Sequence, residues 1–260
     1  MEKKKSKTYK VAKVLVSIFY KKPELIGTEN IPETGAMIIG NHCKTNGPII
    51  SQMYFPKNSY TWCIGQIFDK EECKEYTYQD FWSKKPKAVR WVFKIVSHII
   101  ARPLTSIMNS ADLIPVYHDS RLRTTYRYAV KSLDYGNDVI FPEHDVPHNN
   151  IVYDFQDKFV DTAKYYYRNT GKKAKFVPMY VAPKIHKVVF GKPIEFNPEN
   201  PIAEERKRIC NYLMDEISEM AYSLPHHTVV PYPNIPTWQY PTNTREDDSQ
   251  SENLKSITES

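Results

Sequence analysis

Short apolar runs alternate along this chain with longer stretches in which apolar residues recur at helical spacing. The apolar runs, bounded by turn residues, predict strands of a buried sheet, and the periodic stretches predict amphipathic helices. The predicted strands lie within residues 24–40 (two strands around a turn), 112–117, 138–143, 175–183 and 187–196. One predicted helix begins at Pro48, and four others cover residues 88–101, 120–135, 154–170 and 201–224.

This alternation indicates a single α/β domain over residues 23–224, with a central mixed, mostly parallel sheet of about six or seven strands flanked by helices. Residues 36–39 are continuously apolar, which is typical of a strand covered on both faces. Asn41 and His42 follow this strand directly. We therefore expect these two residues at the carboxyl edge of the sheet, where α/β folds tend to place their sites.

Three segments lie outside this pattern. Residues 56–88 are rich in aromatic and charged side chains, and the sequence leaves open whether they form a cap over the site or ordinary surface loops and a helix. Residues 225–260 are first proline-rich and then acidic, which predicts a disordered tail. Residues 1–22 contain an apolar run too short to cross a bilayer, so a helix lying in the membrane interface or packing on the domain is expected.

Charge distinguishes residues 1–22 from the rest of the chain. The net charge is +6, and these residues hold eight lysines against Glu2, a balance of +7 that leaves −1 for the remainder. Each lysine near an anionic leaflet contributes about 1 kcal/mol to binding, so we expect peripheral attachment to the inner, cytoplasmic face of a membrane. A solvated tag is the alternative, and nucleic-acid binding is not expected because no recognition motif accompanies the lysines.

The cysteines and histidines show no pattern of a metal site. Cysteines stand at 43, 63, 73 and 210 without a CxxC pair or a secretory leader, which predicts reduced thiols in a cytoplasmic protein. Pro147 prevents His144 and His148 from sharing a helix face. Cys43 is a poor nucleophile candidate, because adjacent side chains on an extended chain point apart and His42 would not serve as its base. No metal and no bound cofactor are expected.

Four short blocks of sequence carry a family resemblance. In chain order they read ELIGTENIPETGAMIIGNHCKTNGP, ADLIPVYHDSR, NDVIFPE and FVPMYVAP. They resemble the blocks of the phospholipid/glycerol acyltransferase family, the first being similar to its NHxxxxDP block and the third to its FPEGTR block. With the later FGKPIEF segment, the resemblance covers roughly residues 22–222. It implies the fold of that family and acyl transfer from acyl-CoA or acyl-carrier protein to a lysophospholipid or related glycerol hydroxyl.

The resemblance also implies roles for individual residues. His42 would be the general base that takes the proton of the acceptor hydroxyl, a task for which an imidazole with an ordinary pKa near 6.5 is suited. Asn41 and Glu143 would be its catalytic neighbours, with Glu143 near the acceptor. Arg121 and Arg123 are candidates for an anionic headgroup because the guanidinium fork matches phosphate, and a solvated helix face is the alternative. The expected substrate-binding set also includes His118, Asp145 and Pro178.

Two departures from the family pattern bear on activity. Gly47 stands where the family has the aspartate that orients the histidine ring, and residues 144–146 read His-Asp-Val instead of Gly-Thr-Arg. The side-chain carbonyl of Asn46, a backbone carbonyl and Asp145 are the substitutes that the sequence offers. Two hypotheses follow: an acyltransferase with His42 as general base, or a catalytically impaired lipid-binding or scaffolding protein of the same fold.

Overall fold

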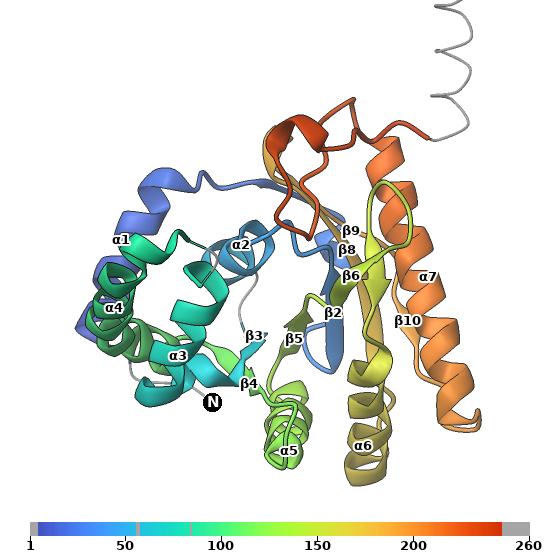
Figure 1. The fold of residues 1–260 in the computed structure, drawn as a ribbon. Helices are drawn as coiled ribbons and strands as arrows, with labels where there is room; N and C mark the ends of the chain where they lie inside the picture. Colours follow the sequence, from blue (N-terminus) through green and yellow to red (C-terminus); the bar gives the residue numbers. More distant parts are fainter. Residues whose placement is uncertain (1–4, 56–57, 84, 246–260) are drawn as a thin grey trace, which may run out of the picture.

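The computed structural model describes residues 5–55, 58–83 and 85–245, and most of its strands form one sheet (Figure 1). In these residues eight strands join that sheet in the order β1-β9-β8-β2-β5-β3-β4, with β10 paired to β8. The eight are β1 (Glu24–Ile26), β2 (Ala36–Gly40), β3 (Ser59–Ile64), β4 (Leu113–Val116), β5 (Asn137–Ile140), β8 (Lys175–Ala182), β9 (Lys187–Phe190) and β10 (Ile194–Glu195). A separate hairpin consists of β6 (Glu143–Pro147) and β7 (Tyr153–Phe155).

The sheet is mixed and mostly parallel, which confirms the predicted fold class. Parallel pairing links β8, β2, β5, β3 and β4 in succession, and also β1 with β9. β9 and β10 pair antiparallel with β8, so β1, which is parallel to β9, also runs opposite to the five parallel strands. Because neighbouring parallel strands end at the same edge, the segments that follow β2 and β5 meet at the carboxyl edge of the sheet.

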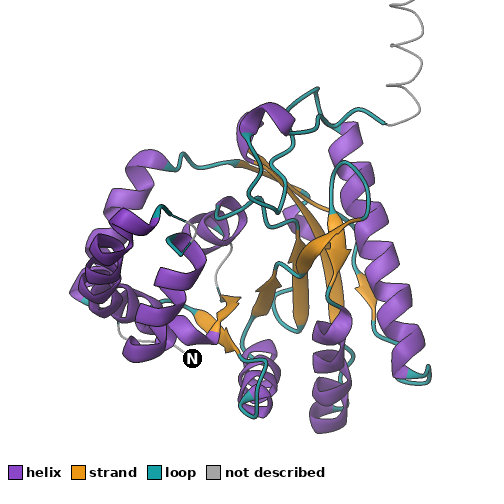
Figure 2. Ribbon diagram, viewed as in Figure 1, coloured by secondary structure: helices purple, strands orange, loops and turns teal. Residues whose placement is uncertain are grey.

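Helices cover both faces of the sheet (Figures 1 and 2). They are α1 (Lys7–Phe19), α2 (Asn46–Tyr54), α3 (Lys70–Phe81), α4 (Arg90–Ser110), α5 (Leu122–Leu133), α6 (Asp161–Thr170) and α7 (Ile202–Ser223). Met37 and Ile39 of β2 lie in the core cluster that contains Leu213 of α7. Ile38, on the opposite face, lies in the cluster that contains Ile50 of α2. This two-sided burial explains the continuous apolar run of β2.

Residues 56–88 contribute a strand to the sheet, which the sequence pattern did not predict. β3 pairs in parallel with β5 on one side and β4 on the other. Its residues are not continuously apolar, and the buried Thr61 accepts a hydrogen bond from the Gln52 amide at 2.8 Å. The strand is therefore stabilised by its two neighbours and by polar partners rather than by an apolar run. The remainder of the described segment forms 3-10 turns and α3.

The helix predicted over 88–101 is longer in the structure. α4 continues through Pro103 to Ser110. A proline inside a helix removes the hydrogen bond to the carbonyl four residues earlier, here that of Ile99. Ile99 and Pro103 are both exposed, so water can satisfy this carbonyl and the helix continues.

The chain after α7 returns to the sheet, in contrast to the predicted disordered tail beginning at 225. We call residues 225–245 the C-terminal strap. Its Val229 is buried in the core cluster on the α7 side of the sheet, and its Val230 in the cluster on the α2 side. A β-bridge between Thr228 and Thr242 closes the base of the strap. Its prolines favour extended backbone, and the apolar residues between them supply the buried contacts. Residues 246–260, the acidic part of the predicted tail, lie outside the described residues.

Candidate active site

The loop between β2 and α2 places His42 at the carboxyl edge of the sheet. β2 ends at Gly40 and α2 begins at Asn46, so the chain turns within residues 41–45. Cys43 (φ 48°) and Lys44 (φ 57°) adopt left-handed backbone in this turn. That conformation costs a non-glycine residue about 1 kcal/mol or more, so the surrounding contacts, rather than local preference, hold the loop.

The ring of His42 is oriented by the backbone of its own loop. Its Nδ1 hydrogen-bonds to the carbonyl of Lys44. Because a carbonyl can only accept, Nδ1 carries the proton, and Nε2 of the neutral ring is left as a basic acceptor. Of the three groups that the sequence offered to orient the ring, the structure thus places a backbone carbonyl against it. The Asn46 amide instead donates to the Cys43 carbonyl at 2.8 Å, and Asp145 is exposed on β6.

The protonation state of His42 suits a general base. Burial lowers the pKa of the imidazole below its ordinary value of 6.5, and the hydrogen bond to the Lys44 carbonyl acts in the opposite direction. The charged form is disfavoured because the surrounding protein replaces water. The ring is therefore neutral at neutral pH and can accept a proton there.

Two aromatic rings flank the imidazole. Phe141, which follows β5, and Tyr232, from the C-terminal strap, both meet the His42 ring edge to face at centroid distances of 5.6 Å. Tyr232 also lies 6.3 Å from the ring of Tyr153 on β7. These contacts restrict the imidazole to one orientation and contribute to its burial.

The C-terminal strap also contacts the loop after His42. The Lys44 ammonium donates to the Asn234 side-chain oxygen at 3.2 Å and lies 5.0 Å from the centroid of the Tyr240 ring. Sequence reasoning did not include the strap in the site, because prolines suggested a tail. The signal that could have revealed it is the set of large aromatic residues among those prolines, Tyr232, Trp238 and Tyr240.

Glu143 connects the His42 loop to the β6–β7 hairpin. Its carboxylate accepts the backbone N–H of His42 on one oxygen and that of Tyr153, at 2.9 Å, on the other. The side chain is 3% exposed, and burial raises its pKa to about 7 against the effect of these two hydrogen bonds. Glu143 therefore positions the loop, and its predicted proximity to the acceptor stays a prediction.

Asn41 joins the end of β2 to β8. Its side-chain oxygen accepts the N–H of Val181 at 2.7 Å, and its amide donates to the Val181 carbonyl at 3.2 Å and to the Cys43 sulfur at 2.9 Å. The residue is 1% exposed. Since both ends of the amide are occupied inside the protein, these contacts position the loop. The predicted catalytic role of Asn41 stays a prediction.

The structure places the predicted anion-binding residues after β4, the edge strand three positions from β2 in the sheet. The Arg121 guanidinium forms ion pairs of 2.7 Å with both Asp119 and Glu72. His118 and Arg123 are exposed nearby. Arg121 is thus already paired with two carboxylates, and none of its described contacts reaches the His42 loop. A role for these residues in substrate binding stays a prediction.

The other two predicted substrate-binding residues differ in burial. Pro178 is buried in β8 opposite Ile39 of β2, and its carbonyl accepts the N–H of Gly191 at 2.9 Å. Asp145 is exposed and raises the pKa of Tyr232, to which burial contributes more. Within the described ranges, no three His, Cys, Asp or Glu side chains are arranged to hold a metal ion.

Comparisons with known proteins identify no family. Neither a protein-family model nor a curated protein matches the chain. Among solved structures, the chain is similar to the crystal structure of the 1-acyl-sn-glycerophosphate (LPA) acyltransferase PlsC from Thermotoga maritima, with a TM-score of 0.47 and 14% sequence identity. The match covers 84% of this chain and 80% of that chain. A similarity at this level assigns no function, so the interpretation rests on the residues of this site.

Gly47 lies too close to its neighbours to accept a side chain. A Cβ there would stand 2.6 Å from the Phe141 ring, 2.9 Å from the His42 carbonyl oxygen and 3.1 Å from that of Asn41. The loop therefore leaves no room at position 47 for the aspartate that the resembled family carries there. The Lys44 carbonyl, which orients the imidazole in its place, is a neutral acceptor.

We expect Gly47→Asp, which introduces the aspartate of the resembled family, to destabilise the protein. A Cβ at this position lies within 3.1 Å of the Phe141 ring and of two backbone carbonyl oxygens, so the free energy of unfolding should fall by about 1–3 kcal/mol. Urea denaturation measures the loss. As a control, the same substitution made in a Phe141→Ala background lacks the ring overlap and should cost less than it does in the unchanged protein. An unchanged free energy of unfolding in Gly47→Asp would show that the loop accommodates the carboxylate.

Proposed function

We propose that this protein transfers a fatty acyl group from acyl-CoA or acyl-carrier protein to the hydroxyl of a lysophospholipid or related glycerol-type acceptor. The observation that carries the proposal is the orientation of His42, whose Nδ1 is held by the Lys44 carbonyl while Nε2 is left as a base. A neutral, half-buried imidazole at the carboxyl edge of an α/β sheet is suited to proton abstraction.

The proposed reaction uses one proton transfer in each direction. Nε2 of His42 takes the proton of the acceptor hydroxyl as its oxygen attacks the thioester carbonyl carbon. The carbon–sulfur bond then breaks, and the imidazolium returns the proton to the departing thiolate. The products are the acylated acceptor and the free thiol of the carrier. In this scheme Glu143 and Asn41 hold the loop, and Arg121, Arg123 and His118 are the proposed contacts for an anionic headgroup.

A second candidate function is acyl-lipid binding without turnover. The observation that favours it is the nature of the group behind the imidazole. An aspartate stabilises the imidazolium formed during proton transfer by its charge, whereas the Lys44 carbonyl is neutral. If this difference is decisive, the same fold binds the acyl chain and does not transfer it.

The test uses the full chain with radiolabelled long-chain acyl-CoA, or acyl-carrier protein, and a panel of lysophospholipids. Formation of a labelled diacyl product in proportion to protein concentration is the expected result. Saturable retention of the labelled acyl chain without product, over the whole panel of acceptors, would contradict acyl transfer and support the binding function. The matched control is Glu29→Gln, an exposed position in the 3-10 turn Thr28–Asn30 between β1 and β2, which should change neither outcome.

A further inference from the structure

Helix α1 exposes its most apolar face to solvent. Tyr9, Ala12 and Val16, on one face, are only half-buried against the domain. The opposite face carries large apolar side chains that are 54–81% exposed: Val11, Val14, Leu15, Ile18 and Phe19. A surface helix of a globular protein normally turns its apolar stripe toward the core, and no residue of α1 is buried. The domain therefore leaves this face uncovered.

Helix α4 presents a second exposed apolar row. Trp91, Ile95 and Ile99 follow one another at a spacing of four residues and are 64%, 52% and 68% exposed. Val92, beside them, is 39% exposed. A shallow hollow of about 360 Å³ lies in this face and is lined by Lys94, Ile95, His98 and Ile99. Large apolar side chains at neighbouring turns of one helix form a contiguous patch, which is typical of a docking surface.

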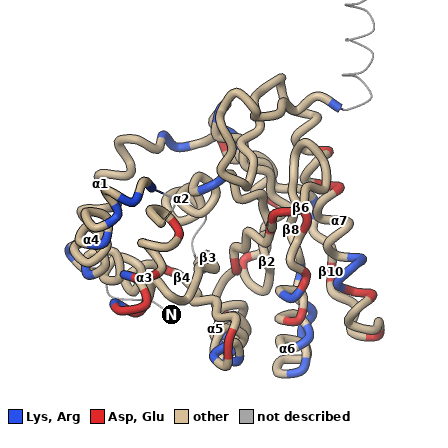
Figure 3. Tube along the Cα trace, viewed as in Figure 1, with Lys and Arg blue, Asp and Glu red and all other residues tan. Residues whose placement is uncertain are grey.

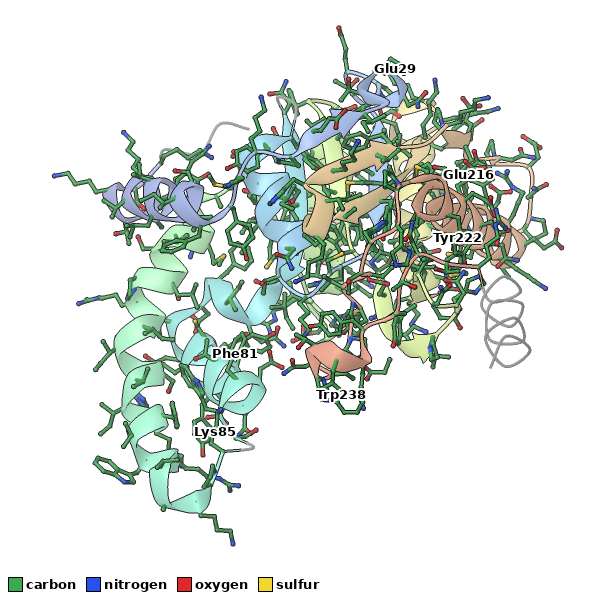
Figure 4. All side chains as sticks on the ribbon, turned by 90° about the horizontal axis from the view of Figure 1, so that it is seen from above. Glu29, Phe81, Lys85, Glu216, Tyr222 and Trp238 are labelled. Carbon is green, nitrogen blue, oxygen red and sulfur yellow. The ribbon has the colours of Figure 1, made fainter. Side chains whose placement is uncertain are left out.

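The two helices form one unit on the same side of the protein. The N–H of Ser6 donates to the Ser110 hydroxyl at 3.3 Å, and the Lys5 ammonium pairs with Asp112 at 2.6 Å. The start of α1 is thus fastened to the end of α4. Figure 4 shows the α3–α4 hairpin, with Phe81 and Lys85 labelled near its turn, projecting away from the sheet. The projection leaves the outer face of α4 accessible, and the apolar face of α1 is accessible because its side chains are exposed.

Charge indicates what covers these faces. α1 contains three lysines and α4 contains Arg90, Lys94 and Arg102, whereas neither helix contains an aspartate or glutamate. Figure 3 shows these basic positions along α1 and α4. A second copy of the chain seated on the same surface would bring six like charges against six. An anionic lipid surface instead attracts the basic side chains and accepts the apolar ones.

We propose that α1 and α4 together form a two-helix surface that docks the protein on an anionic phospholipid membrane, with Trp91, Ile95 and Ile99 entering the interface. No helix in the described ranges is long and apolar enough to cross a bilayer. The proposal deepens the proposed function, because a lysophospholipid acceptor resides in such a membrane, and it adds α4 to the basic segment 1–22.

The test compares sedimentation of the full chain with vesicles of equal parts phosphatidylcholine and phosphatidylglycerol, and with pure phosphatidylcholine. The wild-type protein should prefer the anionic vesicles. Ile95→Ser combined with Ile99→Ser should weaken this binding by about tenfold or more, because two apolar side chains no longer enter the interface. Both residues are exposed, so the midpoint of thermal unfolding should not change. The matched control, Tyr135→Ser with Val146→Ser, removes exposed apolar groups elsewhere and should bind as wild type.

Three results would overturn the proposal: no binding of wild type to anionic vesicles, equal binding by the α4 variant, or a wild-type dimer that the α4 variant dissociates. Size-exclusion chromatography reports the last. The outcome is separable from that of the acyl-transfer assay, in which a water-soluble short-chain acceptor requires no membrane. Vesicle binding without transfer would count against the proposed function alone, and transfer without vesicle binding against the docking surface alone.

Discussion

Replacing His42 with glutamine is expected to lower the turnover number for acyl transfer by about 10³-fold, because the acceptor hydroxyl loses the base that takes its proton. Glutamine is polar and of similar reach, but it has no nitrogen that is basic at neutral pH. Initial rates with labelled acyl-CoA and a saturating lysophospholipid measure the loss. Urea denaturation of both proteins separates lost chemistry from lost folding.

The pH dependence gives an independent readout of the same residue. Since burial holds the pKa of His42 below 6.5, wild-type turnover should be level at neutral pH and fall as the pH drops through that lowered value. The residual activity of His42→Gln should lack this fall. His226→Gln, an exposed histidine at the start of the C-terminal strap, is the matched control and should behave as wild type. An active His42→Gln enzyme with the wild-type pH profile would eliminate His42 as the base.

A second large effect is expected on stability as the pH rises, and its source is Asp138 in β5. The residue is 0% exposed, and burial raises the pKa of its carboxyl to about 8. The Ser132 hydroxyl and the Trp62 indole N–H donate to it at 2.5 Å and 2.9 Å and oppose this rise. In the unfolded chain the pKa is about 3.9. Folding therefore raises the proton affinity of Asp138.

The sign of the effect follows from that difference. The stabilisation is complete below the unfolded pKa and is lost as the pH rises toward about 8, because the unfolded chain releases the proton first. The free energy of unfolding should fall by about 1.4 kcal/mol per pH unit over this range, about 6 kcal/mol in total. Asp138→Asn cannot ionise, so it should abolish this component.

The measurement is the difference in unfolding free energy between Asp138→Asn and wild type, obtained by urea denaturation at several pH values from about 5 to 8. This difference should grow steadily in favour of the variant. Glu143 and the histidines are present in both proteins, so their titration cancels. Glu29→Gln, which removes an exposed carboxylate, should differ from wild type by a constant amount. A constant difference for Asp138→Asn would mean that the carboxyl is ionised in the folded protein.

The fold class could be predicted because it depends on patterns that are local in the sequence. Residues 36–39 are apolar without interruption, and β2 has neighbours on both faces. The periodic stretch over 201–224 forms α7, as predicted, because Ile209, Leu213 and Ile217 lie on one helix face and are fully buried. The position of His42 followed from these patterns, because it comes directly after a buried parallel strand.

Other features depended on contacts between distant parts of the chain. β3 has no apolar run of its own and is stabilised by β5 and β4 on its two sides. The sequence of the C-terminal strap is typical of a tail. In the structure, however, Val230 packs in a core and Tyr232 contacts the His42 imidazole, which lies nearly 190 residues earlier in the chain. Arg121 was predicted to bind phosphate, but the sequence could not show that its guanidinium forms an ion pair with Glu72, 49 residues earlier.

By itself the sequence determined the α/β architecture, the edge of the sheet that carries His42 and the basic character of the first helix. These features depend on apolar patterns and charges of residues that are close together in the sequence. Only the tertiary structure decided that the Lys44 carbonyl orients the imidazole, that Glu143 and Asn41 are occupied in holding the loop, and that α4 adds to the exposed apolar surface of α1. These depend on left-handed backbone and on partners far away in the chain, which no local preference specifies.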